Sequence, residues 1–164
     1  ILDLGKQLLP IGMLVVLDSI LNRITHNRAK GKNTFIIIDE IYLLFQHEYS
    51  ANFLFTLWKR VRKYGAFCTG ITQNVDDLLQ SHTARTMLAN SEFIVMLNQA
   101  STDRIELAKL LNISDLQLSY ITNVDAGNGL IKVGSSLVPF TDQFPRNTKL
   151  YNLMTTKPGE QAAI

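Results

Sequence analysis

The stretch Thr34-Phe-Ile-Ile-Ile-Asp-Glu40 indicates the fold class of this chain. Its centre is a continuous run of large apolar residues, three of them β-branched. A run of this kind is typical of a strand that is covered on both faces, as in a parallel sheet. Two carboxylates, Asp39 and Glu40, follow the run at once. The sequence therefore predicts a buried strand with acidic groups at its carboxyl end.

Two further short apolar runs follow, and helical patterns separate the three. The second run covers residues 66–71 and leads into Thr72-Gln73-Asn74, and the third covers residues 92–97 and leads into Asn98-Gln99. This alternation predicts an α/β layer fold with a mainly parallel sheet and right-handed crossovers. Because ligands of such sheets bind outside the carboxyl ends of the strands, the three polar segments mark the candidate site.

Apolar periodicity and capping residues predict the remaining elements. Ser50, Ser101 and Ser114 are each predicted to cap a helix, and Ser114 forms a capping box with Gln117. The predicted helices cover residues 11–28, 41–46, 50–64, 75–79, 83–90, 101–111 and 114–121. Residues 128–133 and 136–141 are expected to form a hairpin, and a polar tail follows Phe144.

Length and composition exclude several classes of protein. The chain has 164 residues, of which 46% are hydrophobic, so it has enough apolar material for one core and is not a disordered chain. Sixteen Lys and Arg against fourteen Asp and Glu give a net charge of +2, so overall charge gives no argument for a nucleic-acid partner. A single cysteine, Cys68, excludes an internal disulfide framework. The apolar run at residues 8–17 is shorter than the roughly 20 residues that a membrane span needs.

The polar segments after the first two strands suit nucleotide hydrolysis. Asp39 is placed to hold Mg²⁺ beside a triphosphate, directly or through water. Glu40 is placed to orient or deprotonate the attacking water, and Gln73 to reach the γ-phosphate. The alternatives are that Asp39 caps the following helix and that Gln73 belongs to an ordinary polar loop.

A basic cluster lies in the segment Trp58-Lys-Arg-Val-Arg-Lys-Tyr64. Arg60 or Arg62 could act on the phosphates of a neighbouring subunit, and the cluster could also contact nucleic acid. The alternative is a solvated helix face, which is the more common meaning of a run of charges.

The phosphate-binding half of such a site is missing from these residues. A P-loop has the pattern Gly-x-x-x-x-Gly-Lys-[Ser/Thr]. Gly5-Lys6-Gln7 and Gly31-Lys32-Asn33 both lack the hydroxyl residue and the first glycine. Because the chain also begins with Ile1, we expect it to be a piece of a longer protein.

Five segments resemble one family. Residues 35–45 (FIIIDEIYLLF) are similar to the Walker B segment of the large conjugation and type IV secretion ATPases. These form the TraC/TraE/ConE-like group of the FtsK/HerA-type P-loop motors. The other segments that resemble this family are residues 53–65, 70–77, 89–99 and 107–111, and the likeness extends from about residue 4 to residue 158.

The resemblance implies a RecA-like P-loop NTPase fold without its Walker A part, which would occupy residues 1–145, with a polar tail at 146–164. It implies ATP and Mg²⁺ as cofactors and hydrolysis between the subunits of a ring, commonly a hexamer. Asp39 would serve Mg²⁺, Glu40 the water, Gln73 the γ-phosphate, and Arg60 or Arg62 would act in trans.

The resemblance also implies where the protein works. It would be cytoplasmic and peripheral to the inner face of the bacterial cell membrane, where it would energise a conjugation channel together with other channel components. The isolated piece is expected to be inactive. The main alternative is a non-catalytic interaction module of the same machinery, and DNA binding by the basic helix ranks below both.

Overall fold

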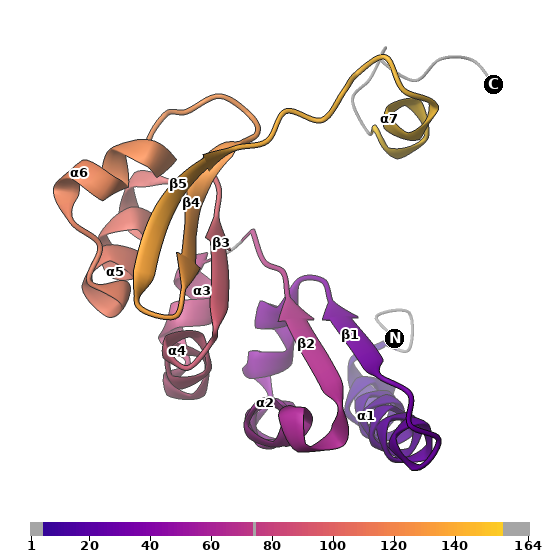
Figure 1. The fold of residues 1–164 in the computed structure, drawn as a ribbon. Coiled ribbons are helices and arrows are strands. Elements are labelled where there is room, and N and C mark those ends of the chain that lie inside the picture. The colour runs from indigo at the N-terminus through magenta and orange to yellow at the C-terminus, as the bar shows by residue number, and fades with distance from the viewer. Residues whose placement is uncertain (1–4, 74, 156–164) are drawn as a thin grey trace. The chain divides into compact units, whose positions relative to one another are not determined.

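The computed structural model describes residues 5–73 and 75–155. The chain divides into two compact units, Ile1–Asn90 and Ser91–Ile164. Each unit has its own small sheet, one parallel and one antiparallel, and we describe them separately (Figure 1).

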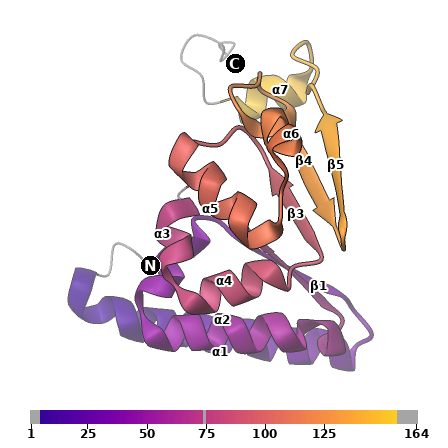
Figure 2. The same cartoon turned by 90° about the vertical axis from the view of Figure 1, so that its left-hand side faces the viewer.

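The first unit is built on a parallel pair of strands. Strand β1 (Thr34–Ile38) pairs with β2 (Ala66–Gly70), in a register that sets Ile36 opposite Cys68. Helices α1 (Gly5–Ala29) and α2 (Glu48–Arg60) lie along the same face of the pair (Figures 1 and 2). The buried core between these elements consists of Ile24, Ile36, Leu57 and Ala66. The predicted α/β class with a parallel sheet is confirmed.

The opposite face of the strand pair is exposed. Phe35, Ile37 and Phe67 are 72%, 70% and 54% exposed, and the two phenylalanine rings stack with centroids 5.0 Å apart. The prediction that the first strand is covered on both faces is therefore met on one face only. Alternating burial along β1 follows from the strand's two-residue period.

A second core joins the remaining helices of this unit. The 3-10 helix η2 (Ile41–Gln46) follows β1, and helices α3 (Val75–Gln80) and α4 (His82–Ala89) follow β2. These helices pack against α2. The buried residues of this second core are Ile41, Leu54 of α2, Leu78, Ala84 and Met87.

The predicted cap of α2 is wrong by three residues, since the N-cap is His47 and not Ser50. Helix α2 begins at Glu48, and Ser50 lies within it, 1% exposed. Its single hydroxyl hydrogen is shared between the backbone oxygen of Leu44 and that of His47, which lies 3.0 Å from Oγ. Ser50 thus ties η2 to α2 instead of capping the helix. Beyond Arg60 the chain tightens into the 3-10 helix η3 (Val61–Tyr64), which ends at Gly65 as predicted, with φ of 62°.

The second unit contains an antiparallel sheet. Strand β3 (Phe93–Met96) pairs with β4 (Asn128–Val133), and β4 pairs with β5 (Ser136–Thr141). The predicted hairpin is confirmed. The third predicted strand exists, but it pairs antiparallel with the hairpin, a partner that the strand–helix alternation did not suggest.

The helices of the second unit follow their predicted positions with one exception. Helix α5 (Ser101–Leu111) begins after Ala100, so Ser101 is its first residue and not its cap. Helix α6 (Asp115–Leu118) starts with the predicted capping box of Ser114 and Gln117, and η4 (Ser119–Ile121) continues it. A further helix, α7 (Lys149–Met154), lies in the segment where only a polar tail was expected. Within residues 5–73 and 75–155, no helix is long and apolar enough to cross a membrane.

Candidate active site at the carboxyl edge of β1 and β2

Hydrogen bonds hold the ends of β1 and β2 together. The backbone N–H of Ile71 donates to the oxygen of Ile38 at 2.8 Å, and the N–H of Ile41 donates to the oxygen of Ile71 at 2.9 Å. Both strands point their carboxyl ends the same way (Figure 1). Asp39 and Glu40 therefore leave the sheet beside the segment that carries Gln73.

Glu40 has two unusual features. Its backbone is left-handed, with φ of 49° and ψ of 47°, a region that costs a non-glycine residue roughly 1–3 kcal/mol. Its side chain is half-buried, and its Oε2 atom is buried without a hydrogen-bond partner among the residues that the structure describes. Strain and an unsatisfied buried oxygen both reduce stability, and such features cluster at functional sites.

Asp39 is exposed, and its Oδ1 accepts a hydrogen bond of 3.0 Å from the backbone N–H of Glu40. No side-chain hydrogen bond caps the start of η2, where Glu40 is the N-cap residue. The alternative in which these acids serve to cap a helix thus has little support in the geometry.

Gln73 is exposed and lies two residues after Ile71, whose backbone is hydrogen-bonded to Ile38 and Ile41. Asn74, its neighbour in the predicted polar segment, lies outside the described residues. Helix α3 follows with Asp76 and Asp77 in its first turn, which adds two carboxylates to the chain just after this edge.

Gly70 is part of the site, although the sequence analysis did not single it out. A Cβ atom at this position would lie 2.6 Å from Cδ1 of Ile41, the buried residue that follows Glu40. A side chain at the last residue of β2 would therefore require the side chain of Ile41 to shift. A glycine at the end of an apolar strand run was the available signal.

Arg60 and Arg62 lie at the other end of the unit. Arg60 ends α2, Arg62 lies in η3, and η3 leads into the first residue of β2. Both side chains are exposed. A five-residue strand spans about 13 Å, so the structure does not bring these arginines to Asp39 and Glu40 within one chain.

The residues at the carboxyl edge fit a magnesium ion that is shared with a ligand. No group of three or more His, Cys, Asp or Glu side chains in residues 5–73 and 75–155 forms a metal cage. Mg²⁺ commonly takes one or two carboxylates and completes its shell with water and phosphate oxygens. Asp39 suits that arrangement, and Glu40 adds a second carboxylate next to it.

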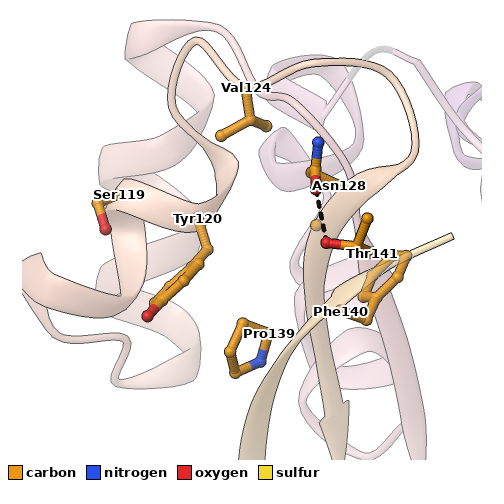
Figure 3. Close-up of a pocket in the computed structure, with 8 residues that line it drawn as sticks. Ser119, Tyr120, Val124, Asn128, Pro139, Phe140 and Thr141 are labelled. Atoms are coloured by element: carbon orange, nitrogen blue, oxygen red, sulfur yellow. Dashed lines mark hydrogen bonds between the residues drawn. The ribbon is translucent and has the colours of Figure 1, made fainter. Parts of the chain in front are cut away.

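Two other features are poor candidates for chemistry. Burial raises the pKa of the Cys68 thiol to about 12, so it stays protonated and is a poor nucleophile. A pocket of about 490 Å³ lies in the second unit, beside η4 and the β4–β5 hairpin (Figure 3). Its lining has no charged side chain and includes the hydrogen-bonded pair Asn128 and Thr141, so it offers neither a magnesium ligand nor a cation for phosphate.

Comparisons with known proteins agree with this architecture. A sequence model of the TraG P-loop domain matches residues 3–138. Among solved structures, VirB4 of Thermoanaerobacter pseudethanolicus is similar, with a TM-score of 0.71 and 26% identity. The match covers 79% of this chain and 36% of that one, so the chain spans little more than a third of that protein. No curated protein matches the sequence.

Proposed function

This chain belongs to the TraG P-loop domain family, and from that premise we propose that it supplies the metal and water half of an ATPase site. The ATPase would serve a conjugation or type IV secretion system. Residues 1–145 would be the C-terminal part of a RecA-like domain, with Walker B at the end of β1, and residues 146–164 its tail. The phosphate-binding loop would come from another part of a longer protein.

The observation that carries the proposal is the backbone conformation of Glu40 together with the burial of its Oε2 atom. Its left-handed backbone and its buried Oε2, which has no hydrogen-bond partner among the described residues, support a role for this carboxylate in function. A glutamate carboxylate can accept the proton of an attacking water or orient that water. Bound ATP and Mg²⁺ would supply the electrophilic phosphorus and neutralise its charge.

The neighbouring residues take the remaining roles at this edge. Asp39 would hold Mg²⁺, directly or through water, because its carboxylate is exposed next to Glu40. Gln73 would contact the γ-phosphate from the end of β2. Its exposed amide can donate to a phosphate oxygen and accept from the water.

Arg60 and Arg62 would act on the site of a neighbouring subunit. They precede β2 while Asp39 follows β1, about 13 Å of strand away, which supports action on another chain. An arginine supplied in trans stabilises the charge of phosphoryl transfer. This role requires a closed arrangement of subunits, such as the hexameric ring that the resemblance implies.

The cellular setting is proposed on the family alone. The protein would work in the cytoplasm at the inner face of the bacterial cell membrane, with other components of the secretion channel as partners. Nucleic acid remains a lesser candidate partner for the basic residues.

The test is ATP hydrolysis by the full-length protein that contains a phosphate-binding loop. Glu40→Gln should lower kcat by at least about a hundredfold, because the amide cannot take a proton from water. ATP binding should be unchanged. Glu48→Gln is the matched control, since Glu48 is an exposed acid in the first turn of α2, and it should retain the full rate.

Turnover at the unmodified rate in Glu40→Gln would refute the water-activating role. It would favour the alternative, a non-catalytic interaction module. The 164 residues alone should show negligible hydrolysis, and steady turnover by them would show that the missing loop is not needed.

A further inference from the structure

The pocket beside η4 has the size of a small-ligand site, about 490 Å³. Tyr120 of η4 lies on one side of it, and Pro139 and Thr141 of β5 lie on the other (Figure 3). Tyr120 is 43% exposed, so its ring is accessible to a ligand. A flat group that enters between these walls would stack on the aromatic ring.

Buried residues hold these walls in place. Ile121, the last residue of η4, and Leu130 of β4 are fully buried. The backbone N–H of Gln99 donates to the oxygen of Ile121 at 3.0 Å, and β4 and β5 pair along their whole length. The pocket is therefore formed before a ligand arrives, which lowers the entropic cost of binding.

The polar side chains of the pocket favour a ligand that donates hydrogen bonds. The Thr141 hydroxyl donates to Oδ1 of Asn128 at 2.7 Å, so its oxygen can only accept from a ligand. The Asn128 amide nitrogen donates to the backbone oxygen of Asp125 at 3.1 Å, while its Oδ1 keeps a second lone pair. Thr141 and Asn128 thus present two acceptor oxygens.

Two acidic residues lie next to the pocket lining. Asp125 follows Val124, Asp142 follows Thr141, and both acids are exposed. The backbone N–H of Asp142 donates to the oxygen of Gly127 at 2.7 Å, so the two acidic segments lie side by side. Their carboxylates make the surroundings of the pocket negative.

The segment that lines the pocket carries almost no positive charge. Residues 119–145 contain one Lys or Arg, which is Lys132. Its ammonium donates to the backbone oxygen of Gly134 at 2.6 Å, at the other end of β4 from Asn128. A cationic ligand is therefore favoured here, and a phosphate group is disfavoured.

We propose that this pocket binds an arginine side chain of another protein. A guanidinium group is flat, positively charged and rich in N–H donors. It would stack on the Tyr120 ring in a cation–π contact and donate to Thr141 and Asn128. A lysine lacks the flat shape, and a nucleotide would bring its phosphate towards the acids. The inference goes beyond the proposed function, because the carboxyl edge of β1 and β2 takes no part in it.

Peptide binding to the full-length protein tests this proposal. The probe is a peptide with both ends capped, Gly-Ser-Arg-Ser-Gly, and the measurement is its dissociation constant from saturation-transfer NMR. Peptides with lysine or uncharged citrulline in place of the arginine should bind at least about fivefold more weakly, because each lacks either the flat shape or the charge. Binding of the arginine peptide should weaken as salt rises.

Substitutions locate the binding in the pocket. Tyr120→Ala should weaken binding of the arginine peptide about tenfold, whereas Tyr120→Phe should retain it because the ring remains. Asp125→Asn with Asp142→Asn should weaken it about fivefold and reduce its dependence on salt. Tyr49→Ala is the matched control, since Tyr49 is an exposed tyrosine of α2, and it should change nothing.

Three results would overturn the inference. The three peptides could bind equally, or Tyr120→Ala could bind the arginine peptide as well as the unmodified protein does. Adenosine could also bind in a manner that depends on Tyr120 while the arginine peptide does not, which would assign the pocket to a nucleobase. If Tyr120→Ala fails to fold, the paired Asp125→Asn and Asp142→Asn substitutions, which preserve side-chain shape, decide the matter.

Discussion

Glu40 and Gly70 illustrate how single residues shape the carboxyl edge. Glu40 adopts a left-handed backbone, and the following Ile41 packs where Gly70 leaves room. The sequence pointed to Asp39 and Glu40 because carboxylates follow an apolar strand run. It did not reveal the left-handed backbone of Glu40 or the unpartnered Oε2, because both appear only in the folded structure.

Gly70→Ala should destabilise the fold by about 1–3 kcal/mol, the usual cost of overpacking a core. The added methyl would stand 2.6 Å from Cδ1 of Ile41. The measurement is the free energy of unfolding from denaturant titration. Ile41→Val removes that Cδ1 atom, so the double variant should be more stable than the sum of the two changes predicts. Strict additivity would show that the close approach is not the cause.

At the scale of elements, the join between η2 and α2 depends on Ser50. Sequence patterns assigned Ser50 to a helix cap because serine is favoured there and apolar periodicity follows it. The structure buries it inside α2, where its hydroxyl reaches back to the turn before the helix. Capping and such backward hydrogen bonds use the same residue types, so the sequence alone does not distinguish them.

Ser50→Ala should lower the free energy of unfolding by about 1–2 kcal/mol, because the partly buried backbone oxygen of Leu44 loses its donor. Ser19→Ala is the matched control. Its hydroxyl also bonds a backbone oxygen within a helix, that of Val15, but on an exposed face. The control should stay within about 0.5 kcal/mol of the unmodified protein. Equal effects of the two substitutions would contradict a special role for Ser50.

The positions of the strands were predicted better than their pairing. Positions 34–38, 66–70 and 93–96 are strands as the apolar runs indicated. Pairing is less visible in a sequence, because it depends on which edges meet after folding. Strand β3 pairs with the hairpin, and β1 leaves Phe35 and Ile37 exposed, so a continuous apolar run did not guarantee cover on both faces.

For the whole molecule, the distribution of charge is the property that composition conceals. Residues 49–75 contain no Asp or Glu and residues 64–84 contain no Lys or Arg, yet where these charges lie depends on the fold. Only the parallel pairing of β1 and β2 gathers the cations at one edge and the carboxylates at the other. The division into two units was likewise not predicted. No stretch of distinct composition marks the boundary between Asn90 and Ser91.

The central claim is that the Asp39–Glu40 edge performs the water step of ATP hydrolysis. The nucleotide retained by the full-length Glu40→Gln protein, after incubation with ATP and Mg²⁺, tests it most directly. The account predicts that this variant retains intact ATP while the unmodified protein holds ADP, because binding survives and the water is no longer activated. ADP in the variant, formed as fast as in the unmodified protein, would contradict the account.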